Sequence, residues 1–489
     1  MNNSKIHKKY TLSLDQLTNE NKIGSGSYGD VYSFNDNYAV KLFNEAGNSE
    51  SNIREVSMLK YLDHPNIVKI KGYCHINDNF LVIMEKARCN LHSQMKNVKK
   101  EHRPFIIFQI LSALKYMHFE NIAHRDIKPQ NILIFNNIDI KICDFGCAKN
   151  DILHGKTHTG EVSTIWYRAP EVILNPGKYD YSIDIWSTGI ILLQLICGTE
   201  FPLTGDSNIG QLFRIFKLFG TPNEKNWEGL SKLKYWKEKF PIFKGDLNKI
   251  LDKYNVLEDE KNILKKMLSW TPTRITASDA MSHPYFTKIN SSYTNDCKIS
   301  QTKTLKTKNQ DYINKFEKYR PILFGWLRTV SYFKKLQKST LLTAYKIIDC
   351  YYSNVIPFWK TVQVIGISCL NIAAKLIDVQ YFENDHIAEL TANTSTSETV
   401  KITTSYILKY FDYNLIPYIF YYKFNNINIY NIICGMIISP ETRYWEHEKM
   451  LIISDMLIKK ETSFETELVL SYFKKIIDID LKKDILFLL

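Results

Sequence analysis

Four side chains suited to handling a phosphate group and a divalent cation follow one another in the first third of the chain. They are Lys41 in "YAVKLF", Asp126 and Asn131 in "HRDIKPQN", and Asp144 in "DFG". An ammonium group can neutralise phosphate oxygens, and carboxylate and amide oxygens are ligands that a hard cation such as Mg²⁺ prefers. Phosphoryl transfer depends mostly on positioning and charge compensation, because the transferred group carries negative charge on its oxygens. These residue types therefore predict phosphoryl-transfer chemistry.

A glycine-rich segment precedes the lysine and is predicted to close over the phosphates. "IGSGSYGDVY" (23–32) has the spacing G-x-G-x-x-G in a β-type setting. Glycine lets the backbone approach a ligand closely because it has no Cβ. Three glycines alone are a weak signal, since any flexible hairpin can contain them. Their order, ahead of the lysine, "HRDIKPQN", "DFG" and a closing "WYRAPE" (166–171), carries the prediction.

The stretch "SESNIREV" (49–56) is predicted to begin a helix with three distinct faces. Glu55 shares a face with the apolar residues three, four and seven positions later, and it can reach Lys41. Ile53 lies about 200° round the same helix and faces outward. Arg54 projects between them. The isoleucine therefore predicts a partner surface.

Changes in composition and in residue pattern divide the 489 residues into several parts. Residues 1–17 form an N-terminal extension, and residues 18–286 combine β-type runs with long helical patterns. Residues 287–310 are rich in Ser, Thr, Lys and Asn, which predicts a flexible linker. Residues 311–417 are helical, and residues 418–489 are interpreted as a reduced second helical unit.

Composition favours a soluble intracellular protein, located in the cytoplasm, the nucleus or both. The nine cysteines show no paired spacing, which predicts reduced thiols. The N-terminus lacks the apolar core of a signal peptide, and the apolar run at 190–197 is too short to span a bilayer. The net charge of +12 comes from scattered lysines, so we expect neither nucleic acid nor membrane as a partner.

The motifs of residues 18–286 resemble those of the protein kinases. "WYRAPEVIL", "YSIDIWSTGIILLQLICGTEFPLTGD" and "TPTRITASDAMSHPYF" are similar to the cyclin-dependent kinases in particular. The resemblance implies a bilobal α+β fold and transfer of the ATP γ-phosphate, with Mg²⁺, to Ser or Thr of protein substrates. Ser163 replaces a valine of the family's loop, so specificity for a following proline is expected less firmly. The resemblance also predicts an ion pair between Arg274 and Glu171.

The resemblance assigns a role to each polar residue. Asp126 would orient and deprotonate the substrate hydroxyl, and Lys128 would neutralise the γ-phosphate. Lys41, held by Glu55, would bind the α- and β-phosphates. The implied ATP-binding residues are Ile23, Gly24, Ser25, Gly26, Gly29, Val31, Ala39, Lys41, Met84, Glu85, Ala87, Asn90, Leu133 and Cys143, and the implied magnesium ligands are Asn131 and Asp144. A pseudokinase is the alternative, but none of its usual losses of Lys, Asp or Asn occurs here.

Three residues correspond to regulatory phosphorylation sites of the family. Thr159 occupies the place of the activating phosphate, which a separate activating kinase would add, and an unmodified loop threonine is the alternative. A phosphate would order the loop if cations converge on it. The cations implied to hold it are Arg54, Arg125 and Lys149. Ser27 and Tyr28 occupy the places of inhibitory phosphates in the glycine-rich loop, and plain loop residues are an equal reading.

The helical segments after the linker resemble the cyclin box, although an unspecified helical bundle is the alternative. The segments, in the order of the family, are "RPILFGWLRTVSYF" (320–333), "STLLTAYKIIDCYYSN" (339–354), "TVQVIGISCLNIAAKLID" (361–378) and "TVKITTSYILKYFDYNLIP" (399–417). Lys375 corresponds to the lysine that holds the kinase helix around Ile53, whereas Thr404 stands where a glutamate usually assists. The possible substrate-docking groove would comprise Leu323, Trp326 and Gln363, with Tyr319 in place of a methionine.

One chain is thus predicted to carry a kinase and its own cyclin-like activator. A linker of about 25 residues could extend to ~80–90 Å and would raise the local partner concentration to the order of mM. Docking could occur in cis or onto a second copy in trans. One alternative is an inert kinase platform acting as a cyclin-mimicking binding protein. Another is a substrate-recruiting helical region, with some other cyclin bound in trans.

Overall fold

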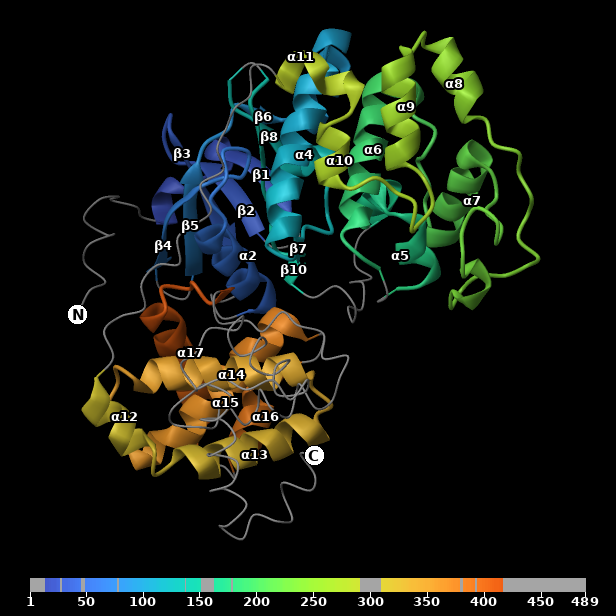
Figure 1. Ribbon diagram of the computed structural model, residues 1–489. Coiled ribbons are helices and arrows are strands. Elements are labelled where there is room, and N and C mark those ends of the chain that lie inside the picture. Colours follow the sequence, from blue (N-terminus) through green and yellow to red (C-terminus); the bar gives the residue numbers. More distant parts are fainter. Residues whose placement is uncertain are drawn as a thin grey trace. The chain divides into compact units, whose positions relative to one another are not determined.

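The computed structural model contains two compact units, whose boundary lies between Lys303 and Thr304. The described residues are 14–26, 29–44, 49–76, 79–136, 138–150, 162–176, 179–290, 309–378, 381–391 and 394–416. The first unit has a sheet-containing lobe and a larger helical lobe, and the second unit is helical (Figure 1). This arrangement confirms the predicted α+β unit followed by an all-α unit. The segment 418–489 lies outside the described residues.

The smaller lobe of the first unit contains a five-stranded antiparallel sheet. In spatial order its strands are β1 (Lys22–Gly26), β2 (Gly29–Ser33), β3 (Tyr38–Phe43), β5 (Asn79–Glu85) and β4 (Ile70–Ile76). Side chains alternate along a strand, so Ala39 and Lys41 share one face of β3 and Val40 lies on the other. Val40 is buried with Leu81 and Ile83, which leaves the face of Lys41 for a ligand.

Helix α2 (Glu50–Tyr61) belongs to the same lobe and carries the "SNIRE" segment. The hydroxyl of Ser49 accepts a hydrogen bond from the Asn52 backbone N–H (3.4 Å) and caps the first turn. Ile53 is 0% exposed and Arg54 is 2% exposed. The prediction that Arg54 sticks out between Glu55 and Ile53 is therefore wrong, because its guanidinium is buried in contacts with neighbouring groups.

The larger lobe is built round α4 (Arg103–Phe119) and α6 (Ser182–Cys197), which contact one another. Its other helices are α3 (Leu91–Gln94), α5 (Pro170–Leu174), α7 (Asn208–Phe219), α8 (Leu247–Lys253), α9 (Glu258–Met267), α10 (Ala277–Met281) and α11 (Thr287–Asn290). Its short strands form two sheets. In one, β8 (Ile132–Ile134) lies between β6 (Cys89–Asn90) and β9 (Ile140–Ile142), and in the other, β7 (Ile122–Ala123) pairs with β10 (Lys149–Asn150). Helix α11 occupies the first residues of the segment that the sequence assigned to the linker.

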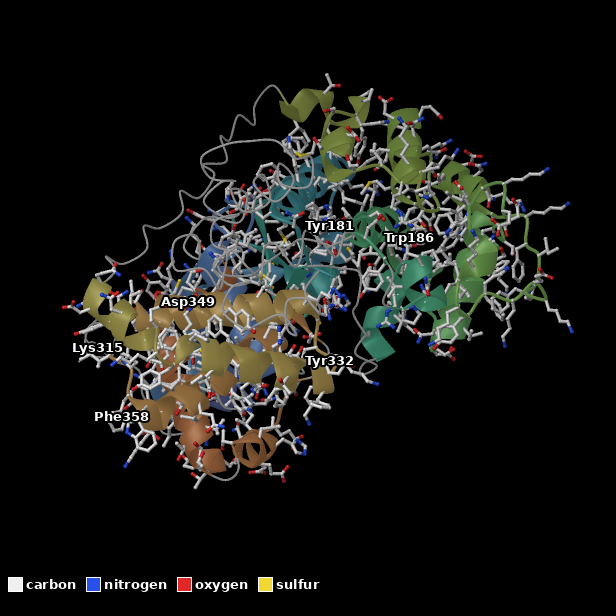
Figure 2. All side chains as sticks on the ribbon, turned by 60° about the horizontal axis from the view of Figure 1, so that its bottom comes forward. Tyr181, Trp186, Lys315, Tyr332, Asp349 and Phe358 are labelled. Atoms are coloured by element: carbon white, nitrogen blue, oxygen red, sulfur yellow. The ribbon has the colours of Figure 1, made fainter. Side chains whose placement is uncertain are left out.

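The predicted ion pair between Glu171 and Arg274 is confirmed. Two nitrogens of Arg274 donate to the two carboxylate oxygens of Glu171, at 2.5 and 3.1 Å. The guanidinium also lies 5.0 Å from the ring centroid of Trp186, which sits among the helices of the larger lobe (Figure 2). Because 103 residues separate the partners, the pair fixes α5 against a distant segment of the lobe.

The second unit places the four predicted helices close to their expected bounds. Its helices are α12 (Gln310–Phe316), α13 (Arg320–Phe333), α14 (Lys338–Tyr352), α15 (Trp359–Ile377), α16 (Asn384–Leu390) and α17 (Ser397–Tyr410). Helix α15 contacts α13, α14 and α17. A buried ion pair of Arg320 and Asp349 joins α13 to α14, with two contacts of 2.7 Å. Helix α16 was not predicted.

Helix α15 is the apolar centre of this unit. A Cβ placed on Gly366 would lie 2.6 Å from Leu323 Cδ1, so the glycine permits close packing of α13 on α15. By length and composition α15 could also cross a membrane, a property that the sequence-based estimate from residues 190–197 overlooked. However, 83% of its apolar window is buried inside the protein, which is expected of a core helix.

Candidate active site

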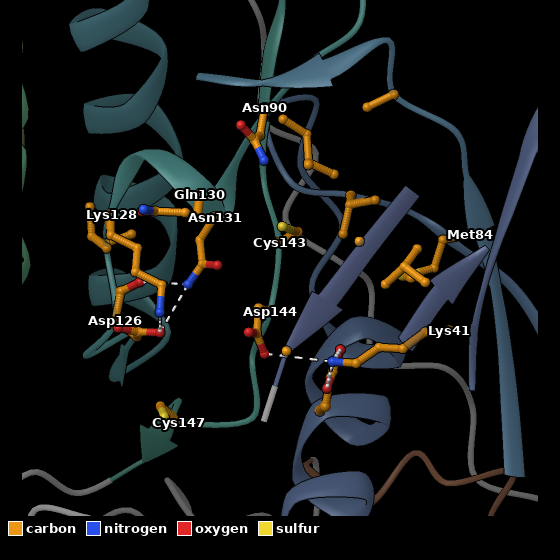
Figure 3. Close-up of a pocket in the computed structure, with 18 of the residues that line it drawn as sticks. Lys41, Met84, Asn90, Asp126, Lys128, Gln130, Asn131, Cys143, Asp144 and Cys147 are labelled. Atoms are coloured by element: carbon orange, nitrogen blue, oxygen red, sulfur yellow. Dashed lines mark hydrogen bonds and ion pairs between the residues drawn. The ribbon is translucent and has the colours of Figure 1, made fainter. Parts of the chain in front are cut away.

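A cavity of about 1000 Å³ in the first unit is lined by residues of both lobes. It contains all fourteen residues that the sequence assigned to nucleotide binding, together with Asp126, Lys128, Asn131 and Asp144. Figure 3 shows Lys41 and Asp144 facing one another, while Asp126 and Lys128 lie farther from Lys41, in the segment "HRDIKPQN" (124–131), here called the catalytic loop. Ile23 is 52% exposed and marks the mouth of the cavity. The predicted residues are thus brought together in one place.

Lys41 forms a buried ion pair with Glu55. Its Nζ lies 2.8 and 2.6 Å from the two carboxylate oxygens of Glu55 and 3.7 Å from Asp144 Oδ1. Burial alone would lower the pKa of Lys41, but Glu55 and Asp144 outweigh it and raise that pKa. Burial raises the pKa of Glu55 to about 7, although Lys41 opposes this shift. The ammonium group is therefore held charged and in place by helix α2.

The catalytic loop carries three polar side chains, Asp126, Lys128 and Asn131, on the side of the cavity away from Lys41. Lys128 Nζ lies 2.8 Å from Asp126 Oδ2, and Asn131 Nδ2 donates to the same oxygen (3.0 Å) and to the Asp126 carbonyl (2.8 Å). Asp126 Oδ1 is buried and has no hydrogen-bond partner among the described residues. Burial raises the pKa of Asp126, while Lys128 opposes the shift. One oxygen of this carboxylate is therefore left without a described partner, in a residue that lines the cavity.

Asp184 of α6 holds the backbone of the same loop in place. Asp184 accepts hydrogen bonds from the backbone N–H groups of His124 (2.9 Å) and Arg125 (2.8 Å), and His118 Nε2 lies 3.0 Å from it. Burial would raise the pKa of Asp184, but its contacts with His118 outweigh burial and lower the pKa. The anchor supports a left-handed backbone at Arg125, where φ is 70°. It thereby fixes the loop that carries Asp126.

Asp144 and Asn131 fit a divalent cation by their donor atoms. Asp144 Oδ1 is buried without a hydrogen-bond partner in the described part of the chain. Burial would raise the pKa of Asp144, but Lys41, His124 and Lys128 lower it, so the carboxylate is ionised. The side-chain nitrogen of Asn131 donates to Asp126, so the side-chain oxygen of Asn131 remains available to coordinate a cation. The described residues contain no group of three or more His, Cys, Asp or Glu side chains that could hold a metal ion by themselves, so phosphate oxygens and water would complete the shell.

Two of the three cations predicted to hold an activating phosphate lie at the turn after Asp144. Arg54 Nη1 donates to the Gly146 carbonyl (2.9 Å), and Arg125 Nη1 donates to the Cys147 carbonyl (3.4 Å). The third, Lys149, lies in β10, whose backbone pairs with β7. Its side chain lies outside the described part, as do the phosphorylation candidates Thr159, Ser27 and Tyr28.

Sequence reasoning missed some residues of the cavity, of which Gln130 is the clearest. Gln130 lines the cavity, and its Oε1 is buried without a partner among the described residues. It lies between Lys128 and Asn131 in "HRDIKPQN", so its position in the motif was an available signal. Asn90 was predicted near a ribose. Its side-chain oxygen caps α3 by accepting from the Ser93 N–H (3.0 Å), which leaves its amide N–H groups for a ligand.

The predicted docking groove of the second unit is partly accessible. Leu323 is only 5% exposed because it packs against Gly366. Trp326 and Gln363 are partly exposed and are the accessible members of the predicted groove. No described contact tests a role in substrate docking, which stays a prediction.

The residues predicted to join kinase and cyclin-like parts belong to different units. Ile53 lies in the first unit and Lys375 in the second, so their contact stays a prediction. Lys375 is 6% exposed, and its Nζ lies 5.4 Å from the ring centroid of Tyr381. Thr404 is 1% exposed, and its hydroxyl is buried without a hydrogen-bond partner among the described residues. A threonine there cannot supply the charge of a glutamate.

Comparison with known protein families agrees with this geometry. Residues 17–286 match the protein kinase domain, which covers more than half of the chain. Residues 289–416 match the N-terminal domain of cyclins. The first match contains the whole cavity, and the second contains helices α12 to α17. The chain therefore belongs to the protein kinases, and its kinase domain is followed by a cyclin N-terminal domain.

Proposed function

We propose that this protein is a Ser/Thr kinase of the cyclin-dependent type that is activated by its own cyclin domain. It transfers the γ-phosphate of ATP to hydroxyl groups of protein substrates, with a preference for a following proline. The observation that carries the catalytic part is the joint placement of the Lys41–Glu55 pair, Asp126 and Asp144 round one cavity. In this set the pKa of Lys41 is raised and that of Asp144 is lowered, so this lysine and this carboxylate carry the charges that phosphoryl transfer requires.

Nucleotide binding follows from the two sides of the cavity. The apolar residues of β2, β3 and β8 enclose the base, and the backbone of Glu85 and Ala87 offers hydrogen bonds to its edge. Lys41 reaches the α- and β-phosphates, while Glu55 prevents it from turning away. Asn131 and Asp144 would hold Mg²⁺, which would offset the negative charge of the phosphates.

Asp126 is the group that handles the substrate proton. Its unused Oδ1 accepts a hydrogen bond from the substrate hydroxyl and aligns that oxygen for attack. Burial has raised its pKa, which makes it a better proton acceptor than an exposed aspartate. Lys128, 2.8 Å from the other carboxylate oxygen, limits this rise and offers its charge to the transferred group. The lysine supports the Ser/Thr specificity that we propose.

Activation in cis is supported by the presence of both domains in one chain. If the segment of about 20 residues between α11 and α12 behaves as a random coil, its root-mean-square reach would be ~22–27 Å. Tethering gives an effective concentration on the order of mM, so even a weak contact would be nearly saturated. This compensates for Thr404, which lacks the charge of the usual glutamate. Lys375 would then hold the "SNIRE" segment of helix α2.

The catalytic part is tested with the full chain, Mg²⁺-ATP and a protein substrate. The Asp126→Asn variant should lose ~10²–10⁴-fold of the turnover rate, because it removes the proton acceptor but keeps the size of the side chain. The wild-type chain should label Ser or Thr in the substrate. An inert kinase platform would instead show no turnover in the wild type, even with Thr159 phosphorylated.

The cis arrangement is tested by mixing two full-length variants. Lys375→Glu disrupts the cyclin contact, and Asp126→Asn disrupts catalysis. If docking is intramolecular, a mixture at nanomolar concentration should be no more active than the sum of its parts. Restored activity in the mixture would indicate docking onto a second copy. Lys360→Glu, an exposed lysine on the same helix, is the matched control and should retain activity.

A further inference from the structure

Glu50, in the first turn of helix α2, contacts the buried guanidinium of Arg54 one turn later. Its Oε1 accepts a hydrogen bond from Arg54 Nη2. The side chain of Arg54 is 2% exposed and that of Glu50 is 11% exposed. The same guanidinium donates through Nη1 to the Gly146 carbonyl at 2.9 Å. Arg54 therefore already has an anion and a backbone acceptor in the described structure.

The local sequence favours this placement of Glu50. A glutamate four residues before an arginine is the better order for an ion pair on a helix. A carboxylate in the first turn is also stabilised by the positive end of the helix dipole, next to the Ser49 cap. A buried guanidinium is costly without a counter-charge, and Glu50 supplies one without any modification of the chain.

The pair sits between two elements of the catalytic site. Arg54 immediately precedes Glu55, which holds Lys41, and it contacts Gly146, which is two residues after Asp144. Because its guanidinium binds both Glu50 and the Gly146 carbonyl, Arg54 joins helix α2 to the turn that follows Asp144, the proposed metal ligand. If its counter-charge were lost, both elements would lose a shared support.

We propose that Glu50 supplies, in the unphosphorylated protein, part of the negative charge that a phosphate on Thr159 would bring to Arg54. Glu50 is therefore a positioning residue, and it makes activity depend only weakly on phosphorylation of Thr159. This inference rests on the proposed kinase function. A phosphate and Glu50 would also repel one another at the same guanidinium, so each reduces the benefit of the other.

The test is a double-mutant cycle of full-length proteins, with the phosphorylation state checked by mass spectrometry. The proteins are the Thr159-phosphorylated wild type, Glu50→Gln in the same phosphorylated state, Thr159→Ala, and the double variant. We expect Thr159→Ala to retain kcat/KM within about threefold of the wild type. Adding Glu50→Gln to it should remove about tenfold or more, whereas Glu50→Gln in the phosphorylated protein should cost less than about twofold.

Controls separate this role from a general effect on helix stability. Glu258→Gln removes an exposed first-turn acid from helix α9 and should change kcat/KM by less than about twofold in either background. Glu50→Asp keeps the charge and should preserve more activity than Glu50→Gln in the Thr159→Ala background. Equal losses for Glu50→Gln in both backgrounds, or a loss above about 100-fold for Thr159→Ala alone, would overturn the proposal.

A readout without catalysis distinguishes failure of this inference from failure of the kinase proposal. Hydrogen exchange of the backbone amides at 143–148 reports the turn that Arg54 supports. In the Thr159→Ala background, Glu50→Gln should make these amides exchange faster, while Glu258→Gln should leave them unchanged. Unchanged exchange in Glu50→Gln would overturn the positioning role whether or not the chain turns over ATP.

Discussion

The ion pair between Lys41 and Glu55 gives a prediction whose size and pH dependence both follow from the structure. Glu55→Gln keeps the size of the side chain and one acceptor oxygen, but it removes the charge 2.6 Å from the Lys41 ammonium. Both side chains are less than a tenth exposed. Breaking one partner of a buried pair costs ~3–5 kcal/mol, and Asp144 at 3.7 Å offsets part of this. We expect kcat/KM for ATP at pH 8 to fall about 100-fold, or about 3 kcal/mol.

The pH profile provides the second half of this prediction. The pKa of Glu55 is raised to about 7, so the carboxyl group takes up a proton as the pH falls through 7. A neutral Glu55 no longer offsets the charge of Lys41, and activity should therefore decline below about pH 7 in the wild type. Glu55→Gln cannot titrate at this position, and its activity should lack that decline. The nucleotide titrates equally in both proteins and cancels in the ratio of the two profiles.

The assay is kcat/KM for ATP at saturating protein substrate between pH 5.5 and pH 8.5 for both proteins. Glu200→Gln, which removes an exposed partner of Lys253, is the matched control and should change activity by less than about twofold. Activity of Glu55→Gln within twofold of the wild type at pH 8 would refute the reasoning about charge. An identical acid limb in both proteins would refute the assignment of that limb to Glu55.

The remaining predictions concern stability. Arg274→Leu leaves the Glu171 carboxylate buried and unpaired, so urea unfolding should show a loss of about 3 kcal/mol, and Arg274→Lys should recover only part of it. Burial lowers the pKa of His64 to about 4, so the unfolded chain binds a proton that the folded chain does not. Stability should therefore fall by up to about 3 kcal/mol from pH 6.5 towards pH 4, and His64→Gln should remove this part of the dependence. Gly366→Ala brings a Cβ to 2.6 Å from Leu323 and should destabilise the second unit by about 1–3 kcal/mol, which Leu323→Val should partly relieve.

The sequence by itself determined the chemistry of the cavity and the outline of the fold. Motif order identified Lys41, Asp126, Asn131 and Asp144, because phosphoryl transfer restricts residue types at those points. The contact of Glu55 with Lys41 was also predicted, since a strand and the following helix can place only a few side chains together. Helical periodicity located α13, α14, α15 and α17, because a helix that buries one face must repeat its apolar residues.

Tertiary structure alone decided which of these side chains are buried and what they contact. The sequence predicted that Arg54 sticks out between Glu55 and Ile53, but 92 residues separate it from the Gly146 carbonyl that it contacts, and no local pattern reports such a pair. The same limit hid the Asp184 anchor under the catalytic loop, which spans 60 and 59 residues to its two backbone partners. Periodicity shows that a helix has an apolar face, but only packing shows which groups cover the rest of it. For this reason the sequence predicted Arg54 as a cation available to a phosphate, whereas the structure shows it already bound to Glu50 and to the turn after Asp144.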